Sequence, residues 1–168
     1  RDRHDGMRKS RAQTCVAFRH NDPADLDRVL ANLRPRNNVF LALESVYSMD
    51  GTICALPDLI KVLERHAPHR NTRHILVDEA HGAGVYGQGG RGVCNALHCH
   101  VSARLVTFGK AFGCAGAVLL VPVLWREYLL NYARPLIYST ALPPSQAAAI
   151  DVVISAWERG EMEAAVQM

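Results

Sequence analysis

Short apolar runs alternate with stretches of helical periodicity along most of this chain. Runs typical of buried strands occupy residues 39–43, 74–77, 105–108 and 116–121. Apolar residues at helical spacing predict helices at residues 22–33, 56–66, 123–132 and 144–157. Strands and helices that alternate in this way are typical of parallel sheets. We therefore predict an α/β fold, with a mostly parallel sheet flanked by helices.

The first two helices carry additional signals. Asp22 can cap the first turn, Pro23 suits a first helical position, and residues 34–38 should end this helix. The apolar face of the first helix is formed by Leu26, Val29, Leu30 and Leu33, and that of the second by Leu56, Leu59, Ile60 and Leu63.

Composition narrows the classes of partner. The 168 residues suffice for one domain with a hydrophobic core, and a net charge of +3 is too small to indicate a polyanionic partner. Residues 1–11 are basic, and we interpret them as a solvated face or a chain end, with nucleic-acid contact as the alternative. The longest apolar run, 115–123, is far too short to span a membrane, and no signal peptide is visible. We expect neither a nucleic-acid nor a membrane partner.

The five cysteines do not indicate a disulfide framework or a zinc site. They are an odd number without a secretory leader, so we expect mostly small buried thiols of an intracellular protein. Cys94 and Cys99 lack the tight spacing and the second pair of a structural zinc site. His98 and His100 flank Cys99 and hint at a metal, but without a second cluster we predict none.

Three polar side chains follow the predicted strands at the point where each strand ends. Ser48 comes after the first strand, Asp78 after the second and Lys110 after the third. In open parallel sheets, ligands bind beyond the carboxyl ends of the strands. This placement predicts a ligand site at that edge of the sheet.

Asp78 and Lys110 each allow several interpretations when taken alone. A carboxylate after an apolar strand is costly unless paired, so Asp78 could cap a helix, pair with an arginine, bind a metal or accept a phosphoryl group. Lys110 lies between Gly109 and Gly113 in a mainly apolar stretch that disfavours the ammonium form. The neutral amine is a nucleophile toward aldehydes, whereas the simpler interpretation is an exposed lysine in a loop.

Taken together, the two residues favour one cofactor, pyridoxal 5'-phosphate (PLP). PLP enzymes of the aspartate-aminotransferase-like kind need a carboxylate that keeps the pyridine nitrogen protonated and a lysine that carries the aldehyde carbon. Asp78 and Lys110, at the ends of successive strands, supply this pair.

Four segments, in this order, resemble motifs of the α-oxoamine synthase family, which are fold-type I PLP enzymes. They are residues 44–51 (ESVYSMDG), 77–82 (VDEAHG), 107–111 (TFGKA) and 134–140 (RPLIYST). Residues 18–22 (FRHND) and 87–92 (GQGGRG) fit the same family, and the resemblance covers about residues 4–157. It implies the large domain of the fold-type I, aspartate-aminotransferase-like fold.

The resemblance also implies roles around the cofactor ring. Lys110 would form the Schiff base and later move the α-proton of the amino acid, and Asp78 would pair with the pyridinium nitrogen. His81 and Ser48 would hydrogen-bond the phenolic oxygen, and Ala80 would lie beneath the ring. Alternatively, His81 is a packed strand-end histidine and Ser48 a turn former.

Three further residues would serve the phosphate group. Thr107 would reach it directly, and Ser139 and Thr140 resemble residues that this family contributes to the neighbouring subunit's phosphate site. The resemblance therefore implies a homodimer with its active site at the interface. Thr140 could also cap a helix before residues 143–144, and the glycines of residues 82–92 are interpreted as shaping a loop.

The activity implied is a decarboxylative condensation of an amino acid with an acyl-CoA or acyl-carrier thioester. L-Alanine and a pimeloyl thioester, as in biotin biosynthesis, are the expected substrates. The alternatives are family members that make aminolevulinate, 2-amino-3-ketobutyrate, 3-ketosphinganine or natural products, or an inactive truncated homologue or interaction subunit. We expect a cytoplasmic location, with peroxisome or mitochondrion as the alternatives in a eukaryote.

The chain departs from the family pattern at two kinds of place. Thr52 and Ala55 stand where Asp and Pro are usual, and we expect altered packing of that loop. We further expect residues 1–168 to form a single but incomplete PLP-binding large domain, lacking an N-terminal segment and a C-terminal small domain. The histidine that stacks on the ring would then precede residue 1, since His4 aligns with a later position.

Overall fold

The computed structural model describes residues 6–33 and 38–162, and it contains one four-stranded sheet. The strands lie in the order β1 (Val39–Glu44), β2 (Arg73–Asp78), β3 (Ala103–Thr107) and β4 (Ala117–Leu120). β1, β2 and β3 are parallel, whereas β4 runs antiparallel to β3. The nine residues 108–116 are too few for the crossover that a parallel return requires, so the chain turns back directly. The predicted α/β fold with a mostly parallel sheet is confirmed.

The predicted helices are present at the expected places. They are α2 (Pro23–Leu33), α3 (Leu56–His66), α5 (Val123–Tyr132) and α7 (Pro144–Glu158). Two four-residue helices, α4 (Val93–Ala96) and α6 (Arg134–Ile137), and the 3₁₀ turns η1 (Arg70–Thr72) and η2 (Gln88–Gly90) were not predicted. A single turn is too short to display a helical period.

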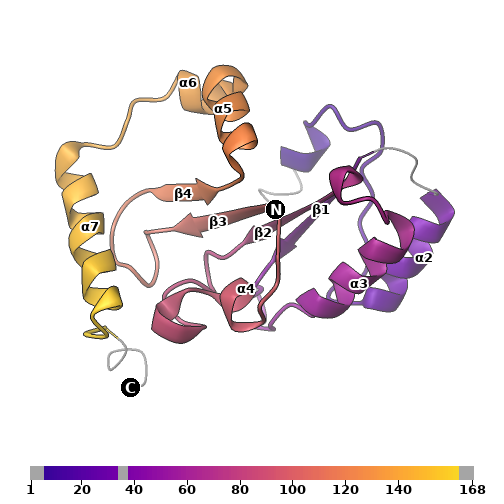
Figure 1. Ribbon diagram of the computed structural model, residues 1–168, viewed down its shortest axis with the longest axis horizontal. Helices are drawn as coiled ribbons and strands as arrows, with labels where there is room; N and C mark the ends of the chain where they lie inside the picture. The colour runs from indigo at the N-terminus through magenta and orange to yellow at the C-terminus, as the bar shows by residue number, and fades with distance from the viewer. Residues whose placement is uncertain (1–5, 34–37, 163–168) are drawn as a thin grey trace.

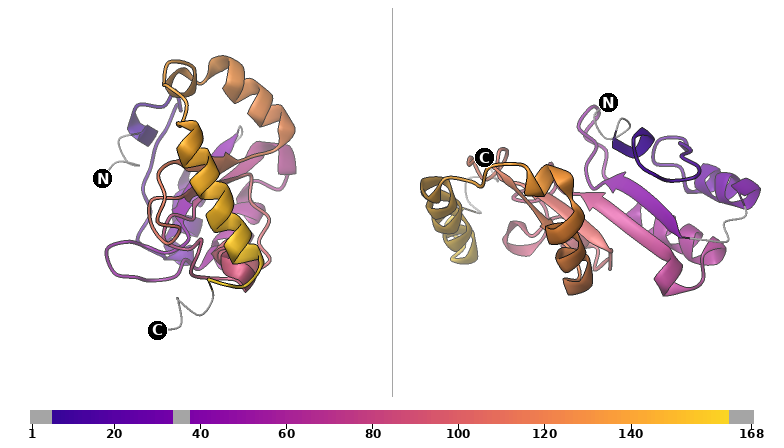
Figure 2. Two further views of the ribbon diagram at one scale, coloured as in Figure 1. Left: turned by 90° about the vertical axis from the view of Figure 1, so that its left-hand side faces the viewer. Right: turned by 90° about the horizontal axis from the view of Figure 1, so that it is seen from above.

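Helices lie at both sides of the sheet. In Figure 1, α2 and α3 lie together beside β1, and α7 lies at the opposite side, beyond β4. When that side faces the viewer, α7 crosses in front of the sheet (Figure 2, left). The site discussed below therefore lies between two helical flanks.

The main core forms between α2, α3 and one face of β1 and β2. Leu56, Leu59 and Leu63 of α3 are each 0% exposed. They belong to one cluster with residues of α2 and of the two strands: Leu26, Leu30, Leu41, Leu43, Ile75 and Val77. The predicted apolar face of each helix is confirmed, except at two positions. Leu33 is 44% exposed because α2 ends there, and Ile60 is only partly buried.

The start of α2 forms as its sequence predicts. The side chain of Asp22 accepts a hydrogen bond from the backbone N–H of Asp25 at 2.9 Å. The last turn of α3 is bonded to α2. His66 and Arg65 of α3 contact the carboxylate of Asp27 in α2 at 2.8 and 3.1 Å. The predicted end of the first helix falls on residues 34–37, which lie outside the described residues, as does His4.

A smaller cluster packs α7 against β3. It contains Ala83, Val106 and Phe108, with Phe112 and Ile150 beside them. The ring of Trp157, at the end of α7, lies 6.0 Å from that of Phe112. α7 is thereby fastened next to the loop that follows β3.

The cysteines are free thiols of mixed exposure. Cys54 and Cys94 are buried, Cys99 and Cys114 are partly buried and Cys15 is exposed, so the expectation of mostly buried thiols holds for only two of the five. Burial raises the pKa of the Cys54 thiol to about 11 and also raises the pKa of Cys94. Within residues 6–33 and 38–162 no group of three or more His, Cys, Asp or Glu side chains is arranged to hold a metal. In the same ranges, no helix combines the length and apolar character needed to cross a membrane.

Candidate active site

The carboxyl ends of β2 and β3 bring the predicted site residues to one edge of the sheet. Asp78, the last residue of β2, is the register partner of Leu105 in β3, and Thr107 ends β3 two residues later. The ladder continues past the strand, because the N–H of Glu79 donates to the carbonyl of Leu105 at 2.8 Å. The segments after both strands therefore start side by side.

Lys110 and His81 meet beyond these strand ends. The Nζ atom of Lys110 lies 2.7 Å from Nε2 of His81. Lys110 itself is exposed, in a tight loop closed by hydrogen bonds from the N–H of Gly113 to the Lys110 carbonyl and from that of Cys114 to the Phe108 carbonyl. The amine is thus held by a side chain that can accept or donate a proton, while it stays open to a ligand.

Asp78 is half-buried and its carboxylate caps the following turn. Its Oδ1 atom accepts a hydrogen bond from the N–H of Ala80 at 2.8 Å. Ala80 is 7% exposed. The capping interpretation of Asp78 is therefore supported for the turn that follows β2.

Thr107 provides a direct test of whether the residues fit PLP. Its hydroxyl oxygen is buried and has no hydrogen-bond partner among the described residues. Such a hydroxyl is costly unless another group satisfies it, and a phosphate oxygen would do so. An acid at one strand end, an amine beyond the next and an unpaired hydroxyl between them fit the donor and acceptor set of PLP.

Ser48, Ser139 and Thr140 are exposed side chains of two other loops. Ser48 is exposed in the loop after β1, and its N–H donates to the Glu44 carboxylate at 3.4 Å. Ser139 and Thr140 are exposed in residues 138–143, between α6 and α7. In the described part of the chain, no hydrogen bond joins any of the three to Lys110.

Glu79 is a residue whose importance the sequence did not reveal. It is 0% exposed, and its carboxylate accepts hydrogen bonds from the N–H groups of Val93 at 3.1 Å and Cys94 at 2.7 Å. Arg104 lies 3.7 Å from the same carboxylate. One sequence feature could have indicated its role: Glu79 is a second acidic residue directly after a buried strand. A buried carboxylate is costly unless other groups pair with it.

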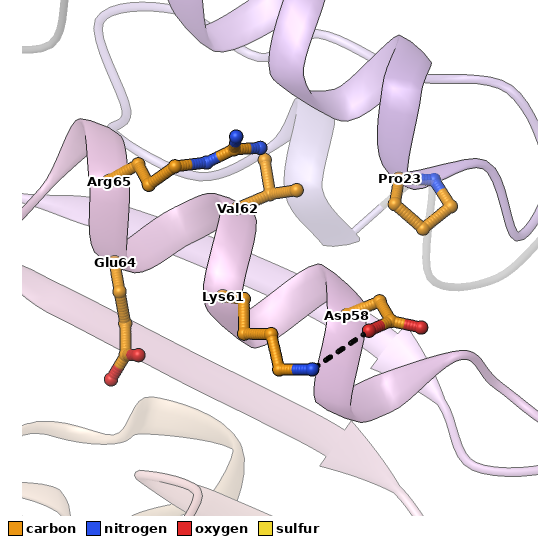
Figure 3. Close-up of a pocket in the computed structure, with 6 residues that line it drawn as sticks. All are labelled: Pro23, Asp58, Lys61, Val62, Glu64 and Arg65. Carbon is orange, nitrogen blue, oxygen red and sulfur yellow. Dashed lines mark hydrogen bonds and ion pairs between the residues drawn. The ribbon is translucent and has the colours of Figure 1, made fainter.

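An open depression in the structure does not coincide with these residues. It has a volume of about 630 Å³ and is lined by Pro23, Asp58, Lys61, Val62, Glu64 and Arg65 (Figure 3). Within it, Lys61 and Asp58 form an ion pair at 3.2 Å. The depression lies along α3 beside the start of α2 and contains none of the predicted site residues.

Comparisons with known proteins give a consistent family. The family model for aminotransferase class I and II matches residues 4–167. The chain is 43% identical over 149 residues to 8-amino-7-oxononanoate synthase of Emericella nidulans, covering 83% of this chain and 36% of the relative. It is also 43% identical over 149 residues to the Serratia proteamaculans enzyme of the same name, covering 86% and 36%. The chain thus spans a little over a third of the length of these relatives.

Two solved structures match the fold. A serine palmitoyltransferase variant from S. paucimobilis with a bound PLP–myriocin aldimine has 33% sequence identity and a TM-score of 0.82, covering 92% of this chain and 39% of that one. The 8-amino-7-oxononanoate synthase of Francisella tularensis has 31% identity and a TM-score of 0.74, covering 92% and 43%.

Proposed function

Because the chain belongs to the aminotransferase class I and II family, we propose that it forms the cofactor-binding core of a PLP-dependent acyltransferase of the α-oxoamine synthase kind. The reaction is the decarboxylative condensation of an amino acid with an acyl thioester. The contact of 2.7 Å between Lys110 and His81, beside the strand-end carboxylate of Asp78, is the observation that carries this proposal.

When bound, PLP supplies an electron sink that stabilises negative charge at the carbon next to the amino group. Asp78 has the role of holding a proton on the ring nitrogen, since a carboxylate favours the charged form of a neighbouring base. Thr107 donates its otherwise unpaired hydroxyl to the phosphate. Ala80, buried at the same turn, would lie beneath the ring.

Lys110 and His81 handle protons in this proposal. The amine of Lys110 would hold the aldehyde group of the cofactor, and it would move a proton at the carbon next to the amino group of the substrate. His81 accepts or donates a proton at Nε2 and orients the Lys110 amine, because a hydrogen bond of 2.7 Å fixes their relative position. Ser48 completes the set from the loop after β1, toward the phenolic oxygen of the ring.

The proposed substrates are L-alanine and a pimeloyl thioester. Identity of 43% to proteins named 8-amino-7-oxononanoate synthase supports this pair over other members of the family. A serine-dependent, long-chain acyl reaction is the second candidate, supported by the TM-score of 0.82 to serine palmitoyltransferase. An inactive homologue is disfavoured, because Asp78, His81 and Lys110 are all retained.

A homodimer is part of the proposed function. Ser139 and Thr140 are exposed side chains, which supports a role in the site of a second copy. Large apolar side chains of α5, of α6 and of the residue after α6 are exposed as well: Leu124, Tyr128, Leu136 and Tyr138. Exposed apolar surface of this extent is typical of protein contact sites.

A substrate panel tests the proposal. The full-length protein is incubated with PLP, with L-alanine, L-serine or glycine, and with pimeloyl-CoA or palmitoyl-CoA, and products are identified by mass spectrometry. We expect the alanine–pimeloyl product, and none from Lys110→Ala. A protein that binds PLP but forms no condensation product from any pair would contradict the proposal.

A further inference from the structure

A fully buried carboxylate lies directly after the proposed site residue Asp78. Glu79 is 0% exposed, and it accepts hydrogen bonds from the N–H groups of Val93 and Cys94 at 3.1 and 2.7 Å. These two residues begin α4, immediately after the glycine-rich loop 82–92. The Glu79 side chain therefore joins the two ends of the segment 79–94 by hydrogen bonds.

Both ends of the glycine-rich loop press against this carboxylate. A Cβ atom at Gly92 would lie 2.8 Å from the carboxyl carbon of Glu79, and one at Gly82 would overlap its Oε2 atom. Real side chains do not approach so closely, so a larger residue at either position would have to displace the Glu79 side chain. The loop's path is thus set by where Glu79 lies.

The middle of the loop contacts the segment that carries Lys110. A hydrogen bond from the N–H of Gly84 to the carbonyl of Gly90, at 2.7 Å, brings two parts of the loop together. A Cβ atom at Gly84 would lie 2.5 Å from Cβ of Ala111, the residue after Lys110. On the other side, a Cβ atom at Gly90 would lie 2.8 Å from the ring of Trp157 in α7. The loop is packed between α7 and the Lys110 segment.

Arg104 links the same loop to the strand that leads to Lys110. Its guanidinium donates to the carbonyl of Arg91 at 2.6 Å and lies 3.7 Å from the Glu79 carboxylate. Arg104 belongs to β3, whose continuation delivers Lys110. Glu79 is therefore connected to the lysine through the loop and through the strand.

We propose that Glu79 is a positioning residue, which holds the glycine-rich loop so that Gly84 and His81 fix Lys110 in reach of the cofactor. The inference rests on the proposed function, because the position that matters is that of the lysine relative to PLP. The competing account is that Glu79 only stabilises the fold.

The substitution Glu79→Gln in the full-length protein separates these accounts. Glutamine keeps the size of the side chain, but it has one acceptor oxygen for two N–H groups and no charge opposite Arg104. We expect the dissociation constant for PLP to rise about tenfold, as when a residue that orients a ligand-binding group is altered. We also expect the pH dependence of the cofactor absorbance to change.

Asp25→Asn is the matched control. Asp25, in α2, is a second buried carboxylate and is 4% exposed. It accepts hydrogen bonds from the backbone N–H of Arg19 and from the side chain of Arg28. Its loss should lower the melting temperature without altering PLP binding. If Glu79→Gln lowers the melting temperature but leaves the PLP dissociation constant and the absorbance profile unchanged, the inference is wrong. If the wild-type protein itself binds no PLP, both the proposed function and the inference fail.

A second pair of variants keeps the test decisive if Glu79→Gln does not fold. Gly84→Ala places a methyl group against Ala111 and strains the backbone at a φ of 80°, and Gly84→Ala combined with Ala111→Gly removes the overlap but keeps the same strain. We expect the single variant to weaken PLP binding and the double variant to recover at least part of it. An unaffected single variant, or a double variant no better than the single one, would show that the loop does not transmit position to Lys110.

Discussion

The Nζ atom of Lys110 lies 2.7 Å from Nε2 of His81, although the two residues are 29 positions apart in the chain. The contact arises from the sheet, because β2 and β3 are parallel neighbours in register at Asp78 and Leu105. Residues that follow the two strands must then emerge at the same edge. The parallel pairing of β2 and β3 therefore places His81 where it can exchange a proton with the Lys110 amine.

Replacing His81 should lower activity more than cofactor content. His81→Ala removes the partner of the Lys110 amine, and general acid–base groups typically contribute about 10²–10⁴-fold to a rate. We expect kcat/KM to fall within that range when the wild type and the variant are both measured at saturating PLP, where the cofactor stays bound, as checked by steady-state assay and absorbance. His69 is an exposed histidine next to η1, and His69→Ala should leave kcat/KM unchanged. Equal activities of the two variants would exclude a proton-handling role for His81.

The core of α3 should determine much of the stability. Leu59 is 0% exposed, and Leu59→Ala leaves a cavity that typically costs about 2–5 kcal/mol of unfolding free energy. Lys61→Ala, on the exposed side of the same helix, should change it by less than about 0.5 kcal/mol. Urea denaturation of both variants measures the difference. Similar losses at the two positions would mean that α3 does not pack as described.

The sequence predicted the strands and the longer helices, and it predicted that Asp78 and Lys110 follow neighbouring strands, because periodicity and strand ends are local signals. The burial of Glu79 was not predictable in this way, since its partners come from residues 93, 94 and 104. The antiparallel direction of β4 follows from a short connection rather than from any pattern within the strand. The roles of Ser48, Ser139 and Thr140 stay predictions.

Asn21 fastens the loop that contains Ser48. Its Oδ1 atom accepts the N–H of Ala55 at 2.7 Å and its Nδ2 atom donates to the carbonyl of Ile53 at 2.9 Å, from a left-handed backbone with φ of 52°. Asn21→Gly should cost about 1–3 kcal/mol through the lost hydrogen bonds. Asn21→Ala should cost about 1–2 kcal/mol more, since alanine is strained at that φ. Thermal unfolding ranks the two, and an alanine variant as stable as the glycine variant would contradict this account.

The hydrogen bond between the Ala55 N–H and Asn21 forms at a position where the family that the sequence resembles usually has proline. Ala55 has a φ of −70°, which a proline ring adopts without strain, but its N–H is the donor to Asn21. A proline at position 55 could not donate this hydrogen bond, because it has no backbone N–H.

Acid should destabilise the protein through Asp25. The N–H of Arg19 and the guanidinium of Arg28, as hydrogen-bond donors, lower the pKa of Asp25 from its ordinary value of 3.8. A lowered pKa means that the folded state binds the proton less readily, so the stabilisation is present above about pH 4 and is lost as the pH falls through the folded-state pKa. The pKa values of Asp27 and Asp50 are lowered too and act in the same direction.

Urea midpoints between pH 7 and pH 3 test this behaviour. Asp25→Asn should be less stable than the wild type at pH 7, and the gap should narrow toward pH 3. A gap that is constant over the range would show that the Asp25 charge contributes nothing.

Reductive trapping locates the cofactor lysine. The full-length protein is incubated with PLP, reduced with borohydride, digested and mapped by mass spectrometry, with Lys110→Ala and the exposed-lysine control Lys61→Ala treated in parallel. We predict a phosphopyridoxyl group on Lys110 in the wild type and in Lys61→Ala, and none in Lys110→Ala. Stable attachment to another lysine, or PLP binding in which Lys110 is never modified, would contradict the proposed active site.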